Sequence, residues 1–199
     1  TWTMGYFIMA DANVEYADRV EKIIYNALGG SITKDFSGLQ YLSAVNQVVA
    51  SPFSNNSHFL RGRSAWRQYR PNHFPECCPG NVHRTMPNFV ARMWMQDGDG
   101  APVAVFFGPG SLDWEYNGIP LKIESITEYP FDETVKFKFS VDKPTDMPFS
   151  FRVPGWCNGA ELYLNGKKVD MNLTAGTFAR ISREWSSGDE LELRLPMTL

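Results

Sequence analysis

The spacing of apolar residues changes at residues 96–100, QDGDG, and this change constrains the fold more than any other feature of the chain. Before it, apolar residues recur at helical spacing, as in residues 16–27. After it, short stretches alternate apolar and polar residues and are separated by turn residues, which is typical of β-strands. The sequence therefore predicts an α+β, multi-domain chain with domains at residues 1–98 and 99–199.

The second half predicts an antiparallel β-sandwich. Its expected strands are residues 103–107, 121–129, 134–141, 149–153, 160–164, 178–183 and 190–195. Val135, Phe137 and Phe139 alternate with lysines, which indicates a strand buried on one face. Asn165-Gly166 is a dipeptide typical of a two-residue hairpin turn. Short strands at this spacing favour a sandwich.

The first half predicts helices around a long irregular segment. Helices are expected at residues 16–27 and 81–96, the second kinked or shortened by Pro87. Residues 4–10 indicate a buried helix, which we expect an upstream segment or another chain to cover. Residues 31–80 hold one expected buried strand, at 40–49. A connection this long is usually functional, so a site is expected within it.

The sequence HFPECCPGNVHR, residues 73–84, concentrates reactive side chains at the expected entry to a helix. It contains the thiols of Cys77 and Cys78, one carboxylate and two imidazoles. A thiolate is a nucleophile and a soft metal ligand, and a helix N-terminus or a metal lowers its pKa. Two thiolates with two further donors would satisfy tetrahedral zinc. The alternative is that the two cysteines are buried and inert. The CxxC spacing that is standard in zinc sites is absent, which weakens the case for a metal.

The same motif, ECCPGNVHR at residues 76–84, resembles the cysteine motif of the β-L-arabinofuranosidase family, glycoside hydrolase family 127, and its relatives. Further similar segments follow the family's order along nearly the whole chain. They are YADRVEK at 16–22, LQY at 39–41, NQV at 46–48, FRVPGWC at 151–157 and LNGK at 164–167. The paired cysteines together with PGWC make the resemblance specific.

The resemblance implies an (α/α)6 barrel that carries the active site, followed by a β-sandwich. Residues 1–98 would then be the final helices of an incomplete barrel. It also implies retaining hydrolysis of L-arabinofuranosides or related plant-glycan side chains, with Cys77 as the nucleophile that forms a thioglycosyl intermediate. Cys77 and Cys78 would both bind zinc, which keeps the thiolate ionised.

The resemblance also identifies what this chain lacks. The family's other two zinc ligands, a glutamate and a cysteine, would lie upstream of the helix that begins near Trp2, and its acid/base glutamate further upstream still. We therefore expect the chain to be inactive by itself.

Three more residues are candidates for binding a carbohydrate substrate. Asn46 and Gln47 end an expected strand, and their amides offer both donors and acceptors to sugar hydroxyls. His73 is placed to contact hydroxyls or a metal. For His73, a hydrogen bond to the backbone of its loop is the alternative.

Composition argues against several partners. The formal net charge of −3 gives no basic surface for nucleic acid, and no apolar run is long enough to span a membrane. Three cysteines, two of them adjacent, do not form a disulfide framework. Free thiols fit a reducing interior and zinc-bound thiolates also fit a periplasm, so the sequence leaves the compartment open.

A second function stays open beside hydrolysis. The sandwich would then be a non-catalytic carbohydrate-binding or structural module, with inert cysteines and, if it binds sugar, a row of exposed tryptophans. Under either function, the apolar segment at residues 4–10 predicts association with another surface.

Overall fold

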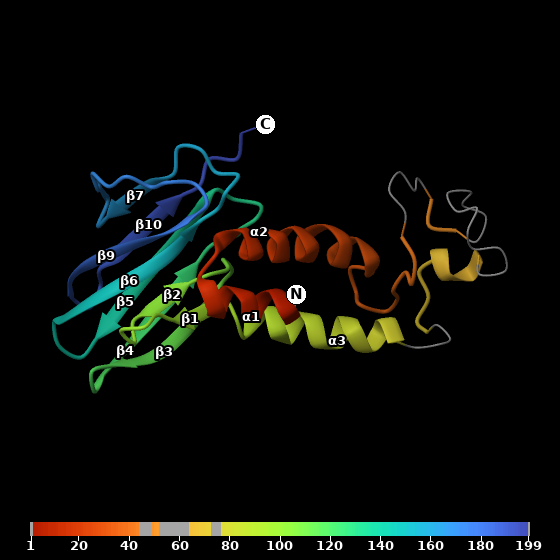
Figure 1. Cartoon of the computed structure of the whole chain (residues 1–199), viewed down its shortest axis with the longest axis horizontal. Helices are drawn as coiled ribbons and strands as arrows, with labels where there is room; N and C mark the ends of the chain where they lie inside the picture. The colour runs from red at the N-terminus through yellow and green to blue at the C-terminus, as the bar shows by residue number, and fades with distance from the viewer. Residues whose placement is uncertain (1, 44–48, 52–63, 73–76, 199) are drawn as a thin grey trace. The chain divides into compact units, whose positions relative to one another are not determined.

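The computed structural model describes residues 2–43, 49–51, 64–72 and 77–198 (Figure 1). The chain forms two compact units, and each is built from two stretches of sequence. The helical unit comprises Thr1–Trp2 and Arg19–Val90, and the β unit comprises Thr3–Asp18 and Ala91–Leu199. The domain boundary that the sequence places between residues 98 and 99 stays a prediction.

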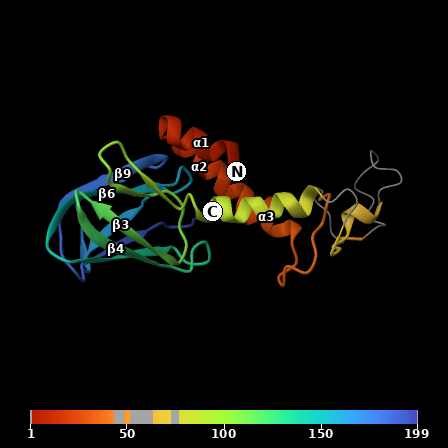
Figure 2. The ribbon, with the colours of Figure 1, turned by 90° about the horizontal axis from the view of Figure 1, so that it is seen from below.

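The β unit contains two sheets, which lie face to face (Figure 2). The four-stranded sheet has the order β1 (Trp94–Gln96), β2 (Pro102–Ala104), β6 (Thr145–Val153), β9 (Thr177–Trp185). The six-stranded sheet has the order β3 (Gly110–Tyr116), β4 (Ile119–Ile126), β5 (Thr134–Val141), β10 (Glu190–Arg194), β7 (Glu161–Leu164), β8 (Lys167–Lys168). Apart from the parallel pair β2–β6, the strand pairs are antiparallel. The predicted sandwich-like fold is therefore confirmed.

Aromatic side chains from both sheets form the core of the β unit. Trp185 of β9 stacks on Phe139 of β5 with ring centroids 3.8 Å apart, and its Nε1 donates to the Met147 carbonyl at 2.9 Å. Phe149 of β6 meets the Phe139 ring edge-on at 5.3 Å. All these side chains are buried, because the alternation along each strand directs them inward.

Two Asn-Gly turns set the register of the hairpins. Asn165 and Gly166 have φ angles of +50° and +76°, as a type I′ turn requires, so the predicted β7–β8 hairpin is confirmed. Asn117 and Gly118 have φ angles of +51° and +76° and join β3 to β4. We did not predict this second hairpin, although the same dipeptide signals it.

The N-terminal segment is helical, but it is not buried in this chain. The helix α1 spans Trp2–Asp11, and Gly5 and Ile8 are its buried residues. Tyr6, Phe7 and Met9 are exposed. The expectation of a helix is therefore confirmed, and the expectation that another segment or chain covers it stays a prediction.

The remaining helices belong wholly or partly to the helical unit. α2 (Val14–Lys22) continues as a π-helix, Ile23–Leu28, which confirms the first predicted helix. α3 spans Cys77–Val90 with Pro87 inside it, so it begins before residue 81 and ends before residue 96. Short 3₁₀ turns lie at Gly29–Ser31 and Ser64–Arg67.

Part of the predicted strand at residues 40–49 lies outside the described residues, and Leu39 beside it forms isolated bridges to Ile32 and Arg70. Among the described helices, none has the length and apolar character needed to cross a bilayer.

A buried ion pair joins α2 to β6 within the β unit. Arg152 has no exposed surface, and its Nη1 lies 2.5 Å from Asp18 Oδ1. Its Nε donates to the Val105 carbonyl at 2.8 Å, and the Gly155 amide donates to Asp18 Oδ2 at 2.8 Å. A Cβ at residue 155 would lie only 2.7 Å from that carboxylate oxygen, so glycine permits the close approach.

Candidate functional site

The paired cysteines occupy the first turn of α3. Cys77 is exposed, Cys78 is half-buried, and both are free thiols. The unpaired backbone N–H groups and the dipole of a helix N-terminus favour negative charge, so this position suits a thiolate. The sequence-based placement of the thiols at a helix entry is therefore confirmed, although α3 starts at Cys77 itself.

Tyr41 brings a hydroxyl to the first thiol. Its Oη lies 3.0 Å from Cys77 Sγ, and its ring packs against Trp66 with centroids 4.1 Å apart. The backbone positions these residues, because the Leu42 amide donates to the Trp66 carbonyl at 2.9 Å. We did not predict Tyr41 as a site residue, since 36 residues separate it from Cys77 in sequence.

The contact makes the two thiols unequal. The hydrogen bond from Tyr41 is the main cause that lowers the pKa of Cys77. Burial is the largest cause that raises the pKa of Cys78, and the neighbouring Cys77 is the next largest. The same hydrogen bond raises the pKa of Tyr41 to about 12, so its hydroxyl stays protonated and donates to the thiolate. Cys77 is therefore the thiol that ionises first.

The other predicted site residues lie outside the described residues. These are Asn46, Gln47 and His73, and their roles stay predictions. Within the described ranges, no group of three His, Cys, Asp or Glu side chains converges as a metal site would require. Cys77 and Cys78 are soft donors that suit zinc and would supply half of a tetrahedral ligand set.

Substituting Tyr41 with phenylalanine is expected to slow alkylation of Cys77 by iodoacetamide at neutral pH. The change removes the main cause that lowers the pKa of Cys77 and keeps the ring on Trp66. At a pH below the Cys77 pKa of both proteins, the variant has a smaller fraction of thiolate. This loss outweighs the higher nucleophilicity of its more basic thiolate. We expect the rate of the metal-free protein to approach that of an ordinary exposed thiol, as measured by peptide mass spectrometry over time.

The pH profile provides the control for this prediction. Above both pKa values the order of rates should reverse, because the thiolate of the Tyr41→Phe variant is then fully formed and intrinsically more reactive. Equal rates for the two proteins at every pH would show that the Tyr41 hydroxyl does not act on Cys77.

Comparisons with known proteins identify the class to which this fold belongs. Residues 103–197 match the sequence model described as beta-L-arabinofuranosidase, GH127 middle domain. A GH127 β-L-arabinofuranosidase from Geobacillus stearothermophilus T6 aligns with 96% of this chain and 29% of its own, at 27% identity and a TM-score of 0.79. A search of curated proteins returned no significant match.

Two further solved structures share the fold. One is a glycoside hydrolase, 24% identical, with a TM-score of 0.77 over 96% of this chain and 30% of its own. The other is a GH127 β-arabinofuranosidase, 19% identical, with a TM-score of 0.78 over 98% of this chain and 30% of its own.

The chain is thus a fragment of glycoside-hydrolase type. More narrowly, it is GH127-like: residues 103–197 match the GH127 middle-domain model and nearly the whole chain aligns with a GH127 structure, which confirms the resemblance seen in the sequence. It spans about three tenths of the length of the solved structures that it matches.

Proposed function

We propose that this chain carries the nucleophile of a retaining glycoside hydrolase that acts on L-arabinofuranosides or related plant-glycan side chains. The contact between Tyr41 Oη and Cys77 Sγ, 3.0 Å long, is the observation that supports this most directly. It favours the thiolate of an exposed cysteine at a helix N-terminus. The similarity to GH127 enzymes supports the reaction class.

In this proposal the Cys77 thiolate attacks the anomeric carbon of the sugar. The glycosidic C–O bond breaks as a thioglycosyl bond forms, and water then cleaves that bond and returns the thiolate. Two displacements at one carbon retain its configuration. The leaving oxygen requires a proton donor, which we assign to no residue of this chain. Asn46, Gln47 and His73 would contact the carbohydrate.

Cys77 and Cys78 would together hold zinc. The bound ion would keep the Cys77 thiolate ionised at neutral pH. Since the chain supplies two of four expected ligands, we propose that the others come from outside it, as does most of the (α/α)6 barrel to which the helical unit would belong. The isolated chain would then be inactive.

Zinc is expected to protect the paired thiols of the isolated chain from alkylation. Two neighbouring thiolates bind a soft cation even without the full ligand set, whereas Mg²⁺ prefers oxygen ligands. Peptide mass spectrometry, with and without Zn²⁺, would follow alkylation of Cys77 and Cys78. Zinc measured by inductively coupled plasma mass spectrometry should be lost in the Cys77→Ser, Cys78→Ser double variant.

The third cysteine is the matched control for the zinc experiment. Cys157 is buried in the β unit, and burial raises its pKa, so it suits neither metal nor alkylating agent. Its replacement, Cys157→Ala, should leave both zinc content and protection unchanged. Alkylation rates that are the same with Zn²⁺ and without it would contradict a two-thiolate metal site.

The structure gives little support to a row of tryptophans that binds carbohydrate. Among the tryptophans described in the β unit, Trp156 is exposed, Trp185 is buried, and Trp94 and Trp114 are half-buried. The Trp114 indole also donates to the Gly100 carbonyl at 3.2 Å, which directs it away from a ligand role.

The apolar helix α1 supports the predicted association with another surface. Trp2 and Met9 near its two ends are 55% and 65% exposed, and Tyr6 and Phe7 between them are also exposed. Contiguous apolar side chains of this size usually mark an interface. We propose that α1 packs against a further apolar protein surface.

A further inference from the structure

We propose that Asn117 is a site of spontaneous covalent modification, deamidation to aspartate and isoaspartate, and that Asn165 is protected from the same reaction. Asparagine is a thermolabile residue, above all before glycine, which has no side chain to obstruct the reacting backbone nitrogen. The chain contains Asn-Gly at residues 117–118, 158–159 and 165–166, all in the β unit. The proposal therefore does not depend on thiol chemistry.

The reaction needs only water and a side chain that can reach the backbone. The Gly118 nitrogen forms a bond to Cγ of Asn117, while the bond from Cγ to the side-chain nitrogen breaks. That nitrogen leaves as ammonia, together with the proton that the Gly118 nitrogen loses. Water then opens the cyclic imide at Cγ to give aspartate, or at the main-chain carbonyl to give isoaspartate. No oxidant or reductant takes part.

The turns at Asn117 and Asn165 have the same backbone conformation. Both are type I′ turns, with φ angles of +51° and +76° in the first and +50° and +76° in the second. Both asparagines are exposed, and both follow a bulky residue, Tyr116 or Leu164. Differences in backbone geometry or local sequence therefore do not separate the two sites, whereas the contacts of their side chains do.

Hydrogen bonds hold both polar atoms of the Asn165 side chain. Its Nδ2 donates to Asp189 Oδ1 at 2.8 Å, and its Oδ1 accepts from the Glu190 amide at 2.9 Å. Asp189 is itself fixed, because it is only 9% exposed and its Oδ2 lies 3.2 Å from Arg183 Nη2. Cγ of Asn165 can turn toward the Gly166 nitrogen only after these hydrogen bonds break.

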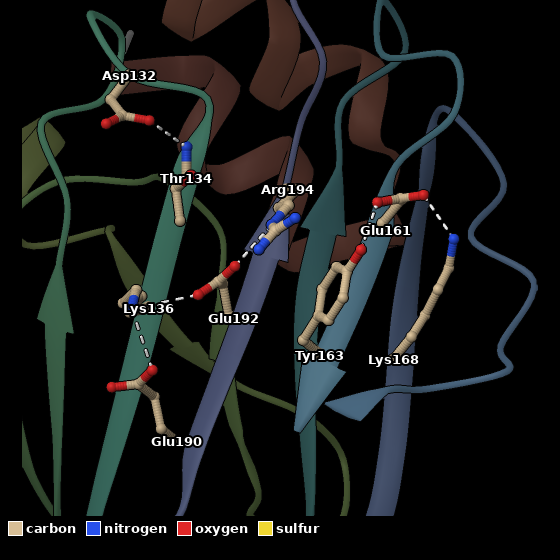
Figure 3. Close-up of polar contacts among 9 residues, drawn as sticks. All are labelled: Asp132, Thr134, Lys136, Glu161, Tyr163, Lys168, Glu190, Glu192 and Arg194. Carbon is tan, nitrogen blue, oxygen red and sulfur yellow. Dashed lines mark hydrogen bonds and ion pairs between the residues drawn. The ribbon is translucent and has the colours of Figure 1, made fainter. Parts of the chain in front are cut away.

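The hairpin that carries Asn165 is also held against β10. Residues 161–164 of β7 pair with residues 191–194 of β10. The Arg194 guanidinium carbon lies 4.1 Å from the centre of the Tyr163 ring, and the Tyr163 hydroxyl donates to Glu161 at 2.8 Å (Figure 3). These contacts keep Asn165 beside the start of β10, where its hydrogen-bond partners lie.

The Asn117 side chain lacks this support. Its turn joins β3 to β4, and β3 is the outermost strand of the six-stranded sheet. Among the residues that the structure describes, none forms a hydrogen bond or an ion pair with the Asn117 side chain. No contact must therefore break before Cγ of Asn117 meets the Gly118 nitrogen, and we expect Asn117 to react faster than Asn165.

Asn158 is a second site with an unrestrained side chain. It is exposed in the bend between β6 and β7, and within the described part of the chain its side chain has no hydrogen bond either. Its backbone differs from that of the two hairpin turns, since Gly159 has a positive φ and Asn158 does not. We expect Asn158 to be modified as well, so the comparison that tests the proposal is the one between Asn117 and Asn165.

Incubation of the full chain at mildly alkaline pH, followed over time by peptide mass spectrometry, tests the proposal. Labelling with protein isoaspartyl methyltransferase and a labelled methyl donor would identify the isoaspartate product. Asn117 should be converted about tenfold faster than Asn165, the factor that one or two hydrogen bonds of ordinary strength provide. In concentrated guanidinium chloride the two rates should become similar, because the protecting hydrogen bonds are lost.

Two variants test the cause of the difference. Asp189→Ala removes the acceptor of the Asn165 amide, so it should speed conversion of Asn165 and leave that of Asn117 unchanged. Asn117→Gly keeps a residue that suits the type I′ turn, and it should abolish the methyltransferase label in that peptide. The comparison within the wild-type chain remains decisive if Asp189→Ala does not fold.

Equal rates for Asn117 and Asn165 in the folded chain would overturn the proposal, as would faster conversion of Asn165. A difference that persists in guanidinium chloride would also overturn it, because local sequence rather than structure would then be the cause. The Cys77→Ser, Cys78→Ser double variant should show unchanged rates at both asparagines. Failure of the proposed thiol chemistry is thereby distinguished from failure of this inference.

Discussion

Replacing Asp18 with alanine is expected to lower the free energy of unfolding by about 3–5 kcal/mol. The guanidinium of Arg152 is fully buried, and it would keep its charge while losing the carboxylate that lies 2.5 Å away. The Gly155 amide would lose its acceptor as well. Chemical denaturation followed by circular dichroism would measure the loss, and the β unit should account for it.

Two variants separate this pair from ordinary ion pairs. Lys168→Ala breaks a pair with Glu161 whose side chains are 60% and 35% exposed, and it should change the stability very little, because solvent screens the pair. Combining Asp18→Ala with Arg152→Met removes both charges and should recover part of the stability. If Asp18→Ala lowered the free energy of unfolding no more than Lys168→Ala does, the pair of Asp18 and Arg152 would contribute no more to stability than an exposed ion pair.

Replacing Trp185 with alanine is expected to cost about 3–5 kcal/mol of unfolding free energy. The side chain is fully buried between the sheets and stacks on Phe139 at 3.8 Å. Its removal leaves a cavity that the close-packed rings around it can fill only in part. The Met147 carbonyl would also lose the hydrogen bond from the indole. Thermal and chemical denaturation should both report the change.

Trp185→Phe is the informative control. It keeps an aromatic ring against Phe139 but lacks the indole N–H, so it should lose clearly less stability than the alanine variant. Trp156→Ala removes a ring of the same kind that is 41% exposed, and its effect should be smaller again. Equal losses for Trp156→Ala and Trp185→Ala would contradict the placement of Trp185 in the core.

Alternation along the chain was sufficient to predict most of the sandwich. β5, for example, spans the predicted residues 134–141, because its lysines and its buried apolar residues alternate strictly. β1 was not predicted, because the helical spacing of apolar residues in α3 continues in the sequence through Trp94 and Met95. These residues instead pair with β2, and such tertiary pairing overrides local preference.

The candidate site was predictable only where its residues are neighbours in sequence. Cys77 and Cys78 could be placed at a helix entry because glycine and proline follow them at once. Tyr41 could not be placed, since it reaches Cys77 through the backbone pairing of Leu39 with Arg70. The substrate-binding roles of more distant residues depend on similar long-range contacts and stay predictions.

The buried pair gives a physical reason for two segments that resemble the family. YADRVEK, residues 16–22, contains Asp18, and FRVPGWC, residues 151–157, contains both Arg152 and Gly155. Although 134 residues separate the two charged side chains, the fully buried guanidinium of Arg152 depends on the carboxylate of Asp18, which is 23% exposed, for its charged partner. The two segments are therefore joined in the folded chain by this ion pair, although they lie in different elements, α2 and β6.

The β unit cannot be inherited as one uninterrupted piece of a gene. Its residues Thr3–Asp18 precede the helical unit in sequence, and Ala91–Leu199 follow it. A recombination event that transferred only the second stretch would deliver Arg152 to a new protein without Asp18. Transfer into an unrelated gene should therefore be tolerated when both stretches move together, and selected against when a breakpoint separates Asp18 from Arg152.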